Sequence, residues 1–136
     1  MFERQTRESS ESRLRAARII WFAMMAAVGG YFLLGWMSLR DPHPTNVEAT
    51  EVNVWLGPLL VTSLVCAFLS FAVRKSMLAK SDGRPGATQS ANVVGFALAE
   101  AAALVGLGAA LVTGNVFSFG IIAVGAVALL LHFPRA

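Results

Sequence analysis

Four runs of apolar residues, separated by short polar stretches, dominate the pattern along the chain. They cover residues 19–39, 52–73, 93–113 and 116–133. About 20 apolar residues cross the hydrocarbon core of a bilayer as a helix. In lipid every backbone N–H and C=O must be bonded within its own segment, so runs of this length have to be helical. The pattern therefore predicts an all-α polytopic membrane protein with four transmembrane helices.

The composition supports this interpretation. The chain has 136 residues, of which 56% are hydrophobic and 14% are charged. An ordinary soluble domain has about 25% charged residues, and a soluble fold of this size has too little interior to bury so much apolar surface. These numbers exclude a water-soluble monomer and a disordered chain. A single cysteine, Cys66, also excludes an intrachain disulfide and a cysteine-rich metal site.

The polar stretches predict the orientation. We expect a basic N-terminal segment at 1–18, an external loop at 40–51, a cytoplasmic loop at 74–92, an external turn at 114–115 and a cytoplasmic tail at 134–136. Ten of the eleven Lys and Arg residues fall in the first, third and last of these. Positive residues stay on the cytoplasmic side, so both termini are expected there. Charge placed in this way does not indicate a nucleic-acid partner.

The connections carry further local signals. Opposite charges spaced i,i+4 within 1–18 are compatible with a cytoplasmic helix that continues into the first run, and a polar tail is the alternative. We expect this first helix to be an uncleaved span rather than a signal peptide. Thr45 and Glu48 have capping-box spacing, which predicts a helix start near Asn46. Pro58 lies within the second run, where it is expected to kink the helix or set its first turn.

Three tryptophans stand near the ends of the first two runs. Trp21 and Trp36 bracket the first run, and Trp55 opens the second. Tryptophan at headgroup depth usually anchors a helix at the interface. We therefore expect these side chains to be anchors rather than parts of a site.

Glu100 is the one acid inside an apolar run. An ionised carboxylate at this depth costs at least about 2.5–3.5 kcal/mol, which makes it a functional candidate. Because the second run is antiparallel to the third, Thr62 and Ser63 are expected near the same depth, where their hydroxyls could donate to Glu100. No Lys or Arg lies within the four runs, so transfer out of water favours the neutral acid. Glu100, Thr62 and Ser63 are therefore a candidate proton- or sodium-binding site. The alternative is a structural role, in which their hydrogen bonds hold one helix to another.

Small residues recur every four positions in the third run, at Ala102, Gly106, Ala110 and Gly114. Such a stripe lets helix backbones approach closely, and packing is the main cohesive contribution in lipid. We expect these four residues to form a helix-packing surface in a homo-oligomer or a larger membrane complex. On a helical wheel Glu100 lies about 100° from this stripe, so it is expected to face another helix or a second subunit.

Two family resemblances follow from these residues. The segment 95–101, GFALAEA, followed by Gly106 and Leu107, resembles the carboxylate helix of the proteolipid (c-ring) subunits of rotary ATP synthases. This resemblance implies a hairpin of the second and third runs in which Glu100 binds H⁺ or Na⁺. The stretch ALAEAAALVGL and the end at 131–135, LHFPR, are similar to small bacterial four-helix inner-membrane proteins of unassigned function. Small multidrug transporters share the length and helix number but carry their acid in the first helix.

Enzymatic chemistry has little support in the sequence. His43 and His132 are expected at opposite membrane faces, and no second acid accompanies Glu100 in the membrane. The acids of the 40–51 loop fit no standard metal spacing. We expect no catalytic residue, no metal and no cofactor. The predicted function is a non-enzymatic subunit or self-associating scaffold of a membrane complex. The alternative is a proton- or sodium-coupled carrier or ring subunit that uses Glu100.

Overall fold

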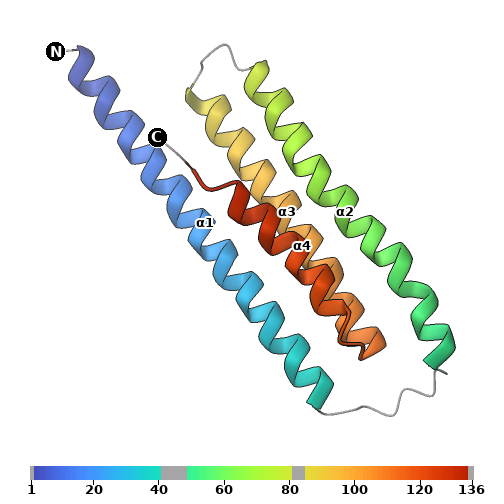
Figure 1. The fold of residues 1–136 in the computed structure, drawn as a ribbon. Coiled ribbons are helices and arrows are strands. Elements are labelled where there is room, and N and C mark those ends of the chain that lie inside the picture. Colours follow the sequence, from blue (N-terminus) through green and yellow to red (C-terminus); the bar gives the residue numbers. More distant parts are fainter. Residues whose placement is uncertain (1, 41–48, 81–84, 135–136) are drawn as a thin grey trace.

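The computed structural model is a bundle of four helices (Figure 1), which confirms the all-α prediction. It describes residues 2–40, 49–80 and 85–134. The helices are α1 (Phe2–Arg40), α2 (Ala49–Ala79), α3 (Pro85–Thr113) and α4 (Ser118–Leu131). By length and composition α1, α2 and α3 can each cross a membrane, whereas α4 has only 14 residues. At 1.5 Å per residue α4 is about 21 Å long, which is shorter than the hydrocarbon core of about 30 Å.

Helix α3 is the centre of the bundle. It packs against each of the other three helices, and α4 lies over it, between α1 and α2 (Figure 1). Within the described residues α1 and α2 make no contact with each other. Half of the apolar stretch of α3 is buried inside the chain, but only 17% of the corresponding stretches of α1 and α2. The two flanking helices therefore keep most of their apolar surface uncovered.

The buried positions of α1 and α2 are spaced three, four or seven residues apart. They are Ala17, Trp21, Val28 and Gly35 on α1 and Ser63, Ala67 and Ser70 on α2. Residues at these intervals lie on one side of a helix. Each flanking helix thus contributes one narrow stripe to the bundle and leaves the rest of its circumference free.

Helices α3 and α4 touch through their backbones. A Cβ atom at Gly106 would lie 2.3 Å from the backbone nitrogen of Ile122, and one at Gly125 would lie 2.4 Å from that of Ala103. These distances are far below van der Waals contact, so both positions require glycine. Gly106 therefore packs tightly, as the small-residue stripe predicts. The contribution of Gly125 was not foreseen from the sequence.

The other three residues of the predicted stripe differ in burial. Ala102 and Ala110 are fully buried, as expected of packing residues. Gly114 is exposed, and a Cβ there would meet nothing within 4 Å, so it takes no part in packing within the chain; its packing against another subunit stays a prediction. Its φ of +58° instead places it in the left-handed region, where glycine ends a helix without strain.

The connection between α3 and α4 is longer than the predicted turn of two residues. It comprises residues 114–117, and α4 begins at Ser118. The side-chain oxygen of Asn115 accepts a hydrogen bond of 2.9 Å from the backbone N–H of Phe117, and the Asn115 carbonyl accepts one of 3.0 Å from the N–H of Ser118. This local bonding turns the chain back and forces α3 and α4 to be antiparallel neighbours.

The structure answers the local prediction for residues 1–18. Helix α1 is continuous from Phe2, which agrees with the helical alternative for residues 1–18. The capping box of Thr45 and Glu48 lies outside the described residues. Pro58 lies inside α2, and its carbonyl accepts a hydrogen bond of 2.9 Å from the hydroxyl of Thr62.

The close contact between α3 and α4 gives a matched test on one helix. Replacing Gly106→Ala should destabilise the bundle by about 1–3 kcal/mol, because the new methyl group meets the α4 backbone. Replacing Gly108→Ala should be neutral or stabilising, because a Cβ there meets nothing within 4 Å and alanine favours helix. The measurement is unfolding of the purified proteins in mixed detergent and dodecyl sulfate micelles. Equal stability of the two variants would contradict the backbone contact.

Candidate functional site: a membrane carboxylate and its neighbours

Glu100 lies at the middle of the central helix. It is the sixteenth of the 29 residues of α3 and is partly buried. The hydroxyl of Tyr31, on α1, donates a hydrogen bond of 2.7 Å to its Oε1 atom. This is the usual length for an O–H···O bond, and the bond holds in either protonation state of the acid. The carboxyl group therefore links α1 to α3 halfway along the bundle.

The second oxygen of the Glu100 carboxyl group, Oε2, has no hydrogen-bond partner in the described part of the chain. Within the described part of the chain no second side chain or backbone group bonds to Glu100. The same residues contain no group of three or more His, Cys, Asp or Glu side chains that could hold a metal ion. Tyr31 is a neutral donor, so it orients the acid without supplying a countercharge. The second oxygen, Oε2, is thus left for a proton, a cation or a donor from outside the chain.

The hydroxyls predicted to serve Glu100 are engaged elsewhere. Ser63, fully buried on α2, lies 3.0 Å from the carbonyl oxygen of Ala102 and 3.4 Å from that of Ile121, so its hydroxyl ties α2 to both α3 and α4. Thr62 is exposed and donates within its own helix. The structure therefore does not bring Thr62 and Ser63 together with Glu100.

Tyr31 is the residue that the sequence analysis missed. It is the only tyrosine of the chain and lies inside the first apolar run. Successive spans alternate in direction, so the first and third run the same way and their middles meet at the same depth. A phenol at that depth is a better placed donor for Glu100 than the hydroxyls of the second span. Depth matching between the first and third spans was the available signal.

A second contact ties α1 to the end of α4. The indole N–H of Trp21 donates a hydrogen bond of 2.7 Å to the carbonyl oxygen of Leu129, and its ring meets Phe133 edge to face at 5.0 Å. Trp21 is only 7% exposed, so it is a helix–helix contact and not the expected interfacial anchor. Trp36 and Trp55 are 51% and 63% exposed and remain available for that role.

His132 closes the same end of the bundle. Its Nδ1 atom lies 2.7 Å from the carbonyl oxygen of Ala128, which can only accept, so Nδ1 carries the hydrogen. The other nitrogen, Nε2, is buried and has no hydrogen-bond partner in the described part of the chain. The ring packs against Phe71 at 4.2 Å and against Gly95, where a Cβ would come within 3.0 Å of it. His132 thus packs the end of α4 against both α2 and α3.

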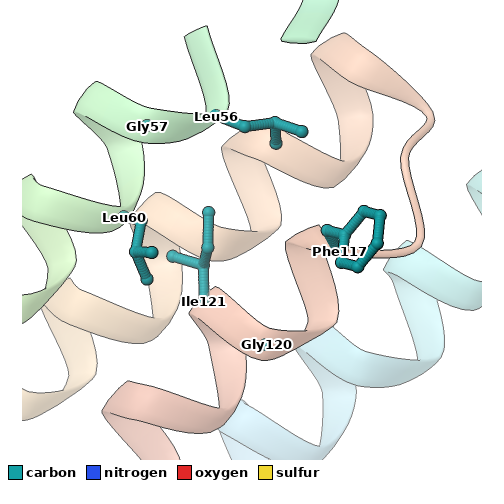
Figure 2. A pocket seen from close by; sticks show the side chains of 6 residues that line it. All are labelled: Leu56, Gly57, Leu60, Phe117, Gly120 and Ile121. Atoms are coloured by element: carbon teal, nitrogen blue, oxygen red, sulfur yellow. The ribbon is translucent and has the colours of Figure 1, made fainter.

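One groove lies between α2 and α4, towards the end that carries the 114–117 turn (Figure 2). Its volume is about 430 Å³, and its lining residues are Leu56, Gly57, Leu60, Phe117, Gly120 and Ile121. All six are apolar, so the groove offers no group for catalysis or for ion binding. It suits hydrocarbon, either from a lipid tail or from an apolar side chain.

Comparison with protein families, with curated proteins and with solved structures finds no match to this chain. The two family resemblances noted from the sequence therefore stay predictions.

The link between Tyr31 and Glu100 can be tested by a double-mutant cycle. Tyr31→Phe should cost about 0.6–2 kcal/mol of unfolding free energy, because it removes only the hydroxyl that bonds the acid. The same change in a Glu100→Ala background should cost almost nothing. The four proteins are compared by unfolding in mixed micelles. Additive effects of the two changes would show that the hydrogen bond does not contribute.

Proposed function

We propose that the chain is a non-enzymatic subunit or self-associating scaffold of a complex in a bacterial inner membrane. It would cross the membrane four times, with both termini in the cytoplasm. The observation that carries this proposal is the poor coverage of α1 and α2, of which 17% of each apolar stretch is buried within the chain. In lipid, helices associate through packing and hydrogen bonds, so uncovered helix faces are the surfaces on which complexes assemble.

The outward side of α1 is suited to such packing. Ala23 and Ala26 are exposed, and a Cβ at Gly29 or Gly30 would meet nothing within 4 Å. Small residues spaced three or four apart allow another helix to come close. By contrast, the small residues of α3 at Gly106 and Ala110 are already used inside the chain. Within the described residues, α1 therefore carries free small-residue surface that supports self-association or assembly.

The state of the protein in its own membrane tests this proposal. Native membranes carrying the chain at natural abundance are solubilised in mild detergent and separated by native electrophoresis, and the particle that contains the chain is weighed and its proteins are identified. We expect several copies, or defined partner proteins in fixed ratio. A Gly30→Leu variant should reduce the particle size, and Gly120→Leu, at an open glycine of α4, serves as the control. A single copy without any partner would overturn the proposal.

An ion-coupled role is the second candidate, and the open carboxylate of Glu100 favours it. The acid stands at mid-helix, is held by a neutral donor, and has no second partner among the described residues. A carboxyl group of this kind exchanges its proton when water or Na⁺ reaches it, as a carrier or a ring subunit requires.

Reaction of Glu100 with a hydrophobic carbodiimide distinguishes the ion-coupled role from the role as a scaffold. If Glu100 carries protons, the reagent should modify it in membranes, less so at high pH, and Na⁺ should protect it if sodium is the ion. Glu100→Gln should abolish both labelling and ion uptake into vesicles while assembly persists. Glu11→Gln, at an exposed acid, should leave labelling unchanged. Full ion uptake by the Glu100→Gln protein would exclude the carrier role.

A further inference from the structure

The central helix keeps one side uncovered. The residues on this side, which we call the outer face of α3, are Ala97, Ala101, Leu104, Gly108 and Leu111. All are exposed except Ala101, which is half-buried, and a Cβ at Gly108 would meet nothing within 4 Å. Their spacing alternates between four and three residues, which is the spacing of a helix seam that receives a partner helix.

The outer face lies opposite α4. At about 100° per residue, its members fall within about 40° of the direction opposite Gly106, the residue that touches the α4 backbone. Helix α1 borders this face through the bond between Tyr31 and Glu100, and α2 borders α3 on the other side through Ser63. Because α1 and α2 do not touch each other in the described residues, nothing in them bridges the face. The outer face of α3 is thus an exposed strip flanked by α1 on one side and α2 on the other.

Glu100 lies at the edge of the outer face of α3 that borders α1. Its Oε1 atom is held by Tyr31, while Oε2 has no partner among the described residues. An acid at mid-depth beside an uncovered helix face attracts a cation or a donor from whatever covers that face. The open oxygen of Glu100 thus selects an occupant that brings a donor or a cation to it.

Two occupants lack the matching group. Acyl chains of lipids carry no donor at the middle of the bilayer. A second copy of this chain brings no Lys or Arg within its predicted spans, and it brings another Glu100. A helix from a different protein with a basic side chain at mid-depth supplies both the apolar seam and the countercharge. Intramembrane acids and bases pair with one another for this reason.

We propose that the outer face of α3 receives a transmembrane helix of a different protein, whose central lysine or arginine bonds to Glu100. This inference rests on the proposed function as a complex subunit and names the surface and the chemistry of its partner. Tyr31 orients the acid towards the incoming cation. The partner helix lies between α1 and α2 and replaces the lipid there.

A synthetic transmembrane helix serves as the probe. The purified full chain, with a donor dye at its amino terminus, is reconstituted into phosphatidylcholine vesicles with leucine-rich peptides that carry an acceptor dye. One peptide has a lysine at its centre, and the matched peptide has leucine there. We expect the lysine peptide to bind about three- to thirtyfold more tightly, as read by energy transfer. Glu100→Gln, which keeps an oxygen for Tyr31, should remove that difference.

Two glycine variants locate the binding surface. Gly108→Leu fills the outer face of α3 and should weaken the binding of both peptides, whereas Gly120→Leu fills the groove between α2 and α4 and should change neither. Circular dichroism and thermal melting confirm that each variant is folded. Equal binding of the two peptides to the unaltered chain would overturn the proposal. So would sensitivity to Gly120→Leu alone, or energy transfer between two labelled copies that is lost in Gly108→Leu.

The proposed function and the inference about the outer face of α3 can be disproved independently of each other. If native membranes yield a multi-subunit particle while the lysine peptide shows no preference, the chain is a complex subunit and only the outer-face inference is wrong. If the native particle is a lone copy, the proposed function is wrong irrespective of peptide binding.

Discussion

The backbone contact between α3 and α4 is the constraint on which the bundle depends. Gly106 and Gly125 allow these helices to approach until a single added methyl group would collide with main-chain atoms. Water cannot drive helices together inside lipid, so closeness of packing has to supply most of the cohesion. Because α3 and α4 form this pair, α1 and α2 can each lie in the grooves beside it without touching one another. The placement of Ser63, Trp21 and the open side of α3 all follow from it.

Hydrogen bonds between helices supplement this packing. Besides the 3.0 Å bond from Arg74 on α2 to Asn92 on α3, three of them lie deeper in the bundle. Ser63 ties α2 to the central pair, Trp21 ties α1 to the end of α4, and Tyr31 ties α1 to the middle of α3. In two of these the acceptor is a main-chain carbonyl already used within its helix, which has a second lone pair to offer. Only in the bond from Tyr31 is the acceptor a titratable side chain, that of Glu100. The bond at Glu100 persists in either protonation state, but of the three it is the one whose strength changes with ionisation, because a carboxylate accepts a stronger hydrogen bond than a neutral acid.

The sequence was sufficient for the class of fold, because long apolar runs leave the backbone no alternative to helix. It also indicated Gly106 and Ala102 as packing residues and Glu100 as the unusual side chain. It did not single out the partner of Glu100, because Tyr31 and the hydroxyls of the second run are expected at similar depth, and depth alone does not tell which of these side chains faces the acid. The same limit hid Gly125, whose requirement for glycine appears only when Ala103 lies against it. Gly114 continues the four-residue repeat one position beyond the end of α3, which the repeat alone does not reveal.

The short fourth helix makes the two sides of the bundle unequal in apolar length. Helix α4 is about 9 Å shorter than an average hydrocarbon core, whereas α3, directly behind it, is long enough to cross fully. A helix shorter than the hydrocarbon core that crosses a bilayer requires the lipid to thin or interfacial side chains to reach inwards, at a cost of fractions of a kcal/mol for each ångström. Such hydrophobic mismatch on one flank favours thin membranes and draws together proteins that deform the bilayer in the same way.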